Sequence, residues 1–116
     1  GAGQAGRVMS EARALEDAGA FAVVLESVDE GIARDVTAAL SIPTIGIGAG
    51  RFTDGQILVV GDMLGMTRGF EPRFLKKYAD LGAEAGRALS EYAAEVRSGA
   101  FPEARHAYAP LKEQAK

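Results

Sequence analysis

The sequence contains no cysteine and a single histidine, His106. Without cysteine the chain forms no disulfide and offers no thiolate for a metal site or for nucleophilic catalysis. One histidine also argues against a histidine-rich metal site or a Ser-His-Asp triad within this chain. Any chemistry must therefore use carboxylates, lysines, hydroxyls or the backbone.

An excess of basic residues and a long apolar run are also lacking. The 13 Lys and Arg against 16 Asp and Glu give a formal net charge of −3, which argues against a nucleic-acid partner. No apolar run approaches the roughly 20 residues of a membrane span, and no signal sequence is recognisable. We therefore expect no membrane partner and a cytoplasmic location. The 116 residues, 47% hydrophobic and 25% charged, are typical of at most one globular domain.

The first half of the chain alternates between helical and strand-like patterns. Apolar residues at three- and four-residue steps predict a helix over 7–18, ended by Gly19. The apolar run FAVVL (21–25) predicts a strand buried on both faces. Asp29 is placed to cap a second helix, and PTIGIG (43–48) predicts the next strand.

The second half continues with QILVVG (56–61), which predicts a third strand. The longest helix is predicted over 71–98, with Pro72 in its first turn and one apolar stripe. The residues expected on its solvated face include Arg73, Lys76 and Lys77. The tail, 99–116, has no clear period and is expected to be a surface arm. Alternation of this kind predicts an α/β fold with parallel strands.

The first residues contain a glycine pattern that is found in dinucleotide-binding folds. Gly1, Gly3 and Gly6 form Gly-x-Gly-x-x-Gly, and Glu26 follows about 20 residues later, where such folds carry a ribose-binding acid. The motif requires a strand before its first glycine, and none precedes Gly1 here. A flexible loop entering a helix is therefore the favoured interpretation.

A second glycine cluster, GIGAG (46–50), follows the predicted second strand. It lacks both the helix and the lysine of a phosphate-binding loop. Two interpretations stay open for Gly48 and Gly50: they let the backbone turn tightly over a crowded rim, or they leave room for a substrate. We take both as candidate substrate-binding positions.

Glu26 is the strongest candidate for a catalytic residue. It directly follows a buried strand, and ligands of α/β sheets and barrels bind at the carboxyl ends of the strands. Partial desolvation there would raise the pKa of the carboxyl and favour a role as general base. The alternative is an acid that only begins a loop. Asp62 follows the third predicted strand in a similar way, but it is also placed to cap a turn.

Several stretches, in this order, resemble the C-terminal half of the ketopantoate hydroxymethyltransferase family. They are ALEDAGAFAVVLE, LSIPTIGIGAG, TDGQILVVGDMLGMT, FLKKYADL and EYAAEVRSGAFPEARHAY. The resemblance extends from about Ala12 to Tyr108, and SIPTIGIGAG followed by TDGQILV is its most specific part.

The resemblance implies a (β/α)8 TIM barrel of the phosphoenolpyruvate/pyruvate type. It also implies hydroxymethyl transfer from 5,10-methylenetetrahydrofolate to the 2-oxo acid 3-methyl-2-oxobutanoate, giving 2-dehydropantoate for pantothenate synthesis. It further implies Mg²⁺ chelated by the oxo acid and by aspartates on earlier strands, and a large homo-oligomer. The proton acceptor of the family ends the strand written here as FAVVLE, so that role carries onto Glu26. Removing the C3 proton then requires this base, while the metal stabilises the enolate.

This sequence departs from the family at two places. Ser27 and Val28 stand after the glutamate where cysteine and proline are usual, and Gly61 replaces a common histidine. Neither change removes the base.

Length is the larger departure, because a full barrel takes about 250 residues and eight strands. We expect 1–116 to be a partial domain with about three β/α units, the last of the barrel. The metal ligands would then lie before Gly1, so none is assigned in this chain, and the fragment would be inactive alone. Three explanations are considered: a truncated piece, which we favour, a segment that oligomerises, and a fragment completed in trans. The alternative functions are another oxo-acid enzyme of the same superfamily and a non-catalytic oligomerising α/β fragment.

Overall fold

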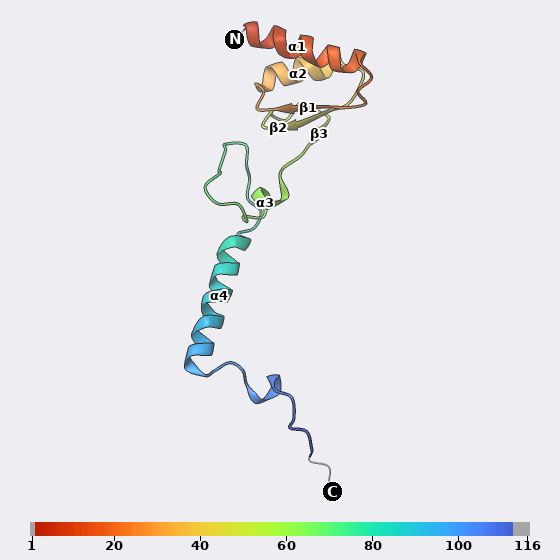
Figure 1. The fold of residues 1–116 in the computed structure, drawn as a ribbon. Coiled ribbons are helices and arrows are strands. Elements are labelled where there is room, and N and C mark those ends of the chain that lie inside the picture. Colours follow the sequence, from red (N-terminus) through yellow and green to blue (C-terminus); the bar gives the residue numbers. More distant parts are fainter. Residues whose placement is uncertain (1, 113–116) are drawn as a thin grey trace.

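A computed structural model describes residues 2–112, and its strands form one parallel sheet (Figure 1). Gly1 of the glycine pattern and residues 113–116 of the expected tail lie outside the described residues. The elements are α1 (Ala2–Asp17), β1 (Val23–Glu26), α2 (Glu30–Ala39), β2 (Thr44–Ile47), β3 (Gly55–Gln56), α3 (Val60–Met63), α4 (Leu81–Ser98) and a 3₁₀ turn (Ala104–His106). The strand order is β1-β2-β3. The α/β class with parallel strands is therefore confirmed.

Helices α1 and α2 lie on one face of the sheet, and the small core is between them and the strands (Figure 1). The core residues are Ala12, Val23, Leu25, Ala33, Val36, Leu40 and Ala49. Side chains of β1 alternate, so Val23 and Leu25 are buried while Val24 is 53% exposed. Burial of this strand on both faces, which the apolar run predicted, is wrong for this chain. No described element covers the face that carries Val24.

Two sets of polar contacts fix how the first helices and strands join. The Glu16 carboxylate at the end of α1 accepts backbone N–H groups from Ser41 (2.6 Å) and Ile42 (3.2 Å), just before β2. Thr44 is fully buried, and its backbone N–H donates to Asp54 Oδ2 at 2.9 Å. These contacts hold the amino ends of the strands, opposite the candidate site.

The predicted loop at the amino terminus is helical. α1 already begins at Ala2, so Gly3 and Gly6 lie inside a helix and do not form a flexible loop. The predicted end of this helix is correct, because Gly19 has a φ of 99° and its N–H donates to the carbonyl of Glu16.

Two predictions for the second half are wrong. The third strand is Gly55–Gln56 instead of 56–61, and the apolar run after it turns into α3. The long helix starts at Leu81, not at residue 71, with Asp80 as N-cap. Pro72 instead opens a turn in which its carbonyl accepts the Leu75 N–H at 2.9 Å. The predicted helix end is confirmed, since Gly99 follows α4 with a φ of 82°.

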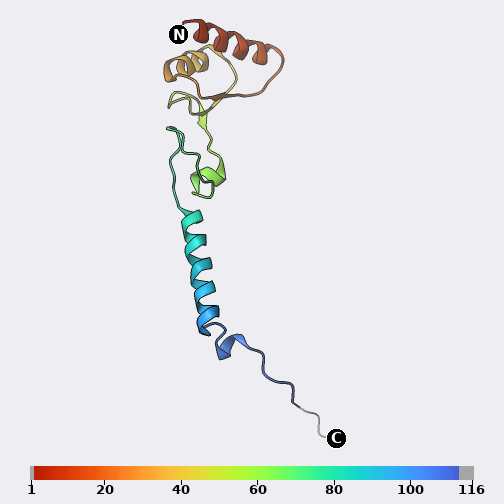
Figure 2. The same ribbon diagram turned by 60° about the vertical axis from the view of Figure 1, so that its left-hand side comes forward.

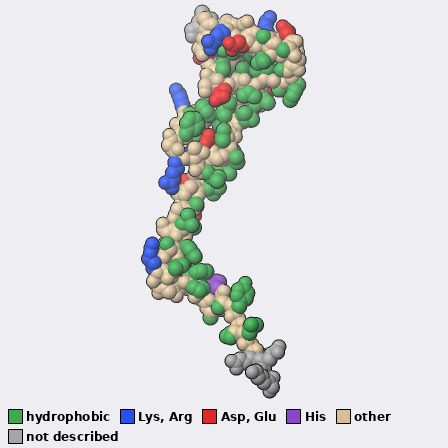
Figure 3. Space-filling view, in the orientation of Figure 1, with side chains coloured by type: hydrophobic (Ala, Val, Ile, Leu, Met, Phe, Trp, Pro, Cys, Tyr) green, Lys and Arg blue, Asp and Glu red, His purple; other side chains and the backbone are tan. Residues whose placement is uncertain are grey.

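The described part of the chain, residues 2–112, is elongated (Figures 1 and 2). Its extents are 86 × 33 × 17 Å and its radius of gyration is 26.0 Å, about twice the roughly 13 Å of a compact domain of about 100 residues. No residue of α4 is buried. Hydrophobic side chains line one side of this extension, while Lys and Arg project from the other (Figure 3). Among residues 2–112, no helix is both long and apolar enough to cross a membrane.

Candidate functional site

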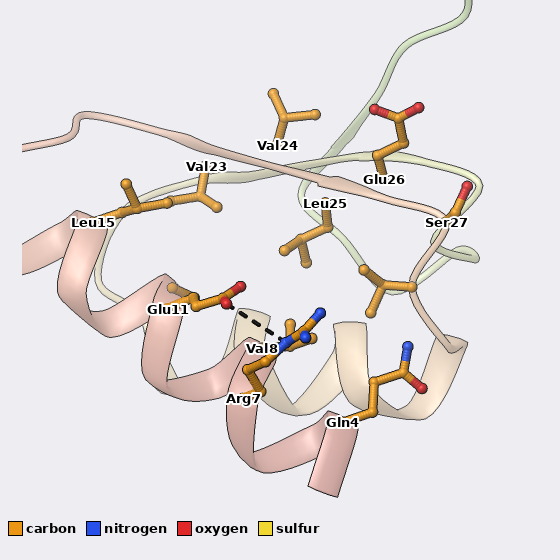
Figure 4. Close-up of a pocket in the computed structure, with 12 residues that line it drawn as sticks. Gln4, Arg7, Val8, Glu11, Leu15, Val23, Val24, Leu25, Glu26 and Ser27 are labelled. Carbon is orange, nitrogen blue, oxygen red and sulfur yellow. Dashed lines mark ion pairs between the residues drawn. The ribbon is translucent and has the colours of Figure 1, made fainter. Parts of the chain in front are cut away.

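Glu26 is the last residue of β1 and pairs in register with Ile47 of β2. Figure 4 shows its side chain on the same side of the strand as Val24, whereas Leu25 points toward the helices. The carboxylate therefore lies at the carboxyl end of the parallel sheet, on the face that α1 and α2 leave open. Its catalytic role stays a prediction, but its position is the one that ligands of such sheets use.

The expected desolvation of Glu26 is absent in this chain. The side chain is exposed, and no described residue donates a hydrogen bond or pairs an ion with it. The physical reason is the open face of the sheet, which no described element covers. A lower dielectric around this carboxylate would require a further part of the protein, or a ligand, to lie over the sheet.

The residue after Glu26 has an unusual backbone conformation. Ser27 has a φ of 53°, the only positive φ among the described residues other than glycine. Its N–H donates to the carbonyl of Ile47 at 2.9 Å, which keeps β1 attached to β2 beyond the last paired residue. The chain then turns into α2, whose N-cap Asp29 accepts the N–H groups of Gly31 and Ile32. The predicted cap at Asp29 is confirmed.

The two candidate glycines lie where other residues approach the backbone closely. A Cβ built on Gly48 would be 2.6 Å from the Phe74 ring, and one built on Gly50 would be 2.6 Å from the Glu30 side chain. Both glycines have positive φ angles, 67° and 77°. Tight turning at this rim therefore explains both glycines, while their contact with substrate is untested.

A hollow of about 650 Å³ lies beside these glycines, at the carboxyl ends of β1 and β2. Its lining residues are Ser27, Val28, Asp29, Glu30, Gly48, Gly50, Arg73 and Phe74. A second hollow of about 330 Å³ shares Gly48, Gly50 and Phe74 with it. The segment 71–78 thus returns to the end of the sheet, and Phe74 forms a wall of both hollows.

Arg73 and Phe74 were missed as site residues because the sequence placed them on a helix. The signals against that helix were turn residues, namely Gly69 and Pro72, together with Asp80 as a later cap. In the structure, segment 71–78 is held at its end by the Tyr78 N–H, which donates to the carbonyl of Met63 at 2.7 Å.

Lys77, in the same segment, forms an ion pair with Glu71. The hydrogen bond to Glu71 is the main reason why the pKa of Lys77 is raised above its ordinary value of 10.5. A burial effect opposes this, and the charges of Glu71 and Asp80 support it. Because the pKa of Lys77 is raised, the ion pair is intact at neutral pH. It is lost only as the pH rises through that raised pKa.

The described residues do not form a magnesium site. Residues 2–112 contain no group of three or more His, Asp or Glu side chains placed to hold a metal ion. Near the strand ends, Asp29 is occupied as a helix cap, and Glu30 interacts with Arg51. Oxygen ligands for Mg²⁺ would have to come mainly from elsewhere.

Glu26, Asp62 and His106, which the sequence singled out, are not among the residues that line this hollow, and Glu26 instead lines a crevice beside α1. Asp62 is in the first turn of α3, and His106 accepts the Glu103 N–H at 3.1 Å near the far end of the chain.

The crevice beside α1 has a volume of about 360 Å³ and runs between α1 and β1, the strand at one end of the sheet order (Figure 4). Its rim includes the ion pair between Arg7 and Glu11 at 3.6 Å.

Comparison with known proteins adds to this geometry. The family model described as ketopantoate hydroxymethyltransferase matches residues 1–104. A 3-methyl-2-oxobutanoate hydroxymethyltransferase of Paracoccus denitrificans is 52% identical over 105 residues, which are 90% of this chain and 38% of that protein. A protein of the same name from Saccharopolyspora erythraea is 56% identical over 105 residues, 90% of this chain and 36% of that protein. The chain thus spans less than two-fifths of the length of these curated relatives.

Proposed function

This chain belongs to the ketopantoate hydroxymethyltransferase family, and on that premise we propose that it forms part of an enzyme of pantothenate synthesis. The enzyme transfers a hydroxymethyl group from 5,10-methylenetetrahydrofolate to 3-methyl-2-oxobutanoate and forms 2-dehydropantoate. The observation that supports this proposal is identity of 52–56%, over 90% of the chain, to relatives named 3-methyl-2-oxobutanoate hydroxymethyltransferase. In this proposal the chain itself is an α/β fragment of the transferase.

The proposed architecture is the last part of a (β/α)8 barrel. In support of it, all three strands are parallel, and α1 and α2 lie on one face as the outer layer of a barrel does. The open face with Val24 and Glu26 would then point into the barrel. The remaining strands would pair along the sheet edges and cover this face.

Glu26 acts in this proposal as the general base. Its carboxylate takes the proton from C3 of the 2-oxo acid, and the C3 carbon forms a bond to the methylene carbon of the folate. The two C–N bonds of that methylene carbon break, water supplies the hydroxyl oxygen, and the protons from C3 and from water pass to the two folate nitrogens, so that tetrahydrofolate leaves. Gly48 and Gly50 would border the substrate through their backbone, since both line the hollow at the strand ends.

The proposed Mg²⁺ requirement belongs to the complete enzyme. Residues 2–112 do not themselves form a metal site. We therefore assign the Mg²⁺ ligands to the part of the relatives that this chain does not match. We also propose a homo-oligomer, supported by the exposed apolar residues of α4, and a cytoplasmic location. Because the metal ligands are assigned outside this chain, the 116-residue chain alone should show no turnover.

The test uses a chimera in which this chain replaces the matched 105 residues of the P. denitrificans relative. In deuterium oxide with Mg²⁺ and no folate, the chimera should exchange the C3 proton of 3-methyl-2-oxobutanoate, as followed by NMR. Glu26→Gln should slow this exchange by about 10²–10⁴-fold, the usual contribution of a general base. Glu95→Gln on α4 is the matched control and should leave the rate unchanged.

A folded chimera with no exchange would contradict the enzyme function. It would favour a non-catalytic fragment that oligomerises, for which the exposed residues of β1 and α4 are the supporting observation. Exchange without any hydroxymethyl transfer to the oxo acid would favour another oxo-acid enzyme of the same superfamily.

A further inference from the structure

The hollow at the carboxyl ends of β1 and β2 is lined by an arginine that the proposed function does not use. We propose that Arg73 binds a carboxylate of the glutamate tail of the folate co-substrate in this hollow. This inference rests on the proposed function, because the folate is part of it.

One side chain of the hollow, Arg73, offers donors to an anion. The two acidic lining residues of the hollow are engaged, since Asp29 caps α2 and Glu30 interacts with both the backbone N–H and the guanidinium of Arg51. Arg73 is exposed, and no described carboxylate lies within 4.0 Å of its charged group. It is the only cation among the described residues that line this hollow. A guanidinium with free donors is suited to bind a carboxylate through two parallel hydrogen bonds.

The hollow has room for the larger of the two reactants. Its volume of about 650 Å³ lies within the range of about 300–1,000 Å³ for sites of ligands much larger than a small oxo acid. The adjoining hollow of about 330 Å³ continues past Phe74. An exposed arginine that lines the hollow suits the charged end of a long ligand.

Contacts on both sides of Arg73 fix its backbone before a ligand binds. The neighbouring Phe74 ring lies against the backbone of Gly48. On the other side, Pro72 closes a turn to Leu75, and Glu71 pairs with Lys77. A binding residue held in this way loses less conformational freedom on association.

The experiment measures the dissociation constant of tetrahydrofolate for the chimera, which does not require turnover. Arg73→Gln should raise it about threefold, the scale of an exposed ion pair. Arg68→Gln, another exposed arginine outside this hollow, is the matched control and should have no effect. When both carboxylates of the glutamate tail are converted to amides, the dissociation constant for the unsubstituted chimera should rise by the same factor. The dissociation constant for Arg73→Gln should not rise further.

A dissociation constant that Arg73→Gln leaves unchanged would overturn the inference. It would also be overturned if the variant raised the KM for the 2-oxo acid instead, because the arginine would then hold the other reactant. Failure of the proposed function is seen separately, as the absence of C3 proton exchange in an assay that contains no folate.

Discussion

Backbone angles at the ends of β1 and β2 decide which atoms border the hollow. Ser27, Gly48 and Gly50 have φ angles of 53°, 67° and 77°. Glycine adopts such angles readily, but a residue with a Cβ pays roughly 1–2 kcal/mol. Strain of this kind persists where the surroundings hold it, and it is frequent at functional sites. Ser27 directly follows the proposed base, so this strain supports a functional role for the end of β1.

The role of Gly48 can be separated from that of a general turn glycine. Gly48→Ala should lower the free energy of unfolding of the chimera by about 2–4 kcal/mol, because backbone strain adds to overpacking against Phe74. Urea denaturation measures this. In the Phe74→Ala background the same substitution should cost only the strain, about 1–2 kcal/mol.

Gly69→Ala is the control for strain alone. Gly69 has a φ of 77°, but a Cβ there would meet nothing within 4 Å. Equal losses for Gly48→Ala and Gly69→Ala would show that the Phe74 contact has no energetic weight. A loss of substrate affinity that persists in the Phe74→Ala background would instead indicate that Gly48 contacts the substrate.

The sequence predicted some site residues and missed others for a physical reason. Glu26 at a strand end and Asp29 as a cap follow from local patterns, since each depends on its immediate neighbours. Arg73 and Phe74 reach the hollow only because residues 71–78 return across the chain. This is a long-range contact, which no local period reveals.

At the level of elements, a buried hydroxyl joins β2 to α2 and to the start of β3. Thr44 Oγ1 lies 2.7 Å from Thr37 Oγ1, and it accepts the Asp54 N–H at 3.3 Å. Thr44→Val keeps the shape but removes these hydrogen bonds and leaves the Asp54 N–H without its acceptor. We expect a loss of about 1–3 kcal/mol in the free energy of unfolding, measured by urea denaturation of the chimera.

Thr67→Val gives the comparison, because Thr67 is an exposed threonine. It should change stability by no more than about 0.5 kcal/mol. If both valine variants lost the same free energy, the buried network would not be what joins these elements.

The predicted elements are correct where the chain packs on itself. The helices and strands up to residue 47 agree with their periodic patterns, apart from the start of α1 and the exact strand ends. The third predicted strand failed because its apolar residues find no cover here: Ile57, Val59 and Val60 are 46%, 56% and 66% exposed. An apolar run indicates side chains that a folded protein can bury. The described residues provide no element that covers these three side chains, so the run does not form the predicted strand.

At the scale of the whole molecule, α4 carries an apolar stripe that stays largely exposed, although the Tyr92 ring lies 5.6 Å from the Phe101 ring, measured between centroids. Leu89, Tyr92 and Val96 are 68%, 54% and 47% exposed. Because such a stripe is an association surface, the 116-residue chain should self-associate in light scattering. Leu89→Glu should weaken this association by about tenfold or more, as expected for losing one buried leucine.

Ser90→Glu adds the same charge to α4 about 100° further around the helix and serves as the control. It should leave the association unchanged. A strictly monomeric chain, or equal effects of both variants, would contradict the role of the stripe in a homo-oligomer.

The direction in which α4 leaves the molecule is set by main-chain atoms. The N–H groups of Leu81 and Gly82 donate to the carbonyls of Leu64 (2.9 Å) and Gly65 (3.0 Å), and a Cβ on Gly82 would be 2.8 Å from the Gly65 oxygen. Since this joint depends on peptide groups and a missing Cβ, the outward surface of α4 can change without redirecting the helix. The exposed side chains of α4 can therefore vary, and with them the proteins that the helix contacts, while its angle to the rest of the chain stays constant.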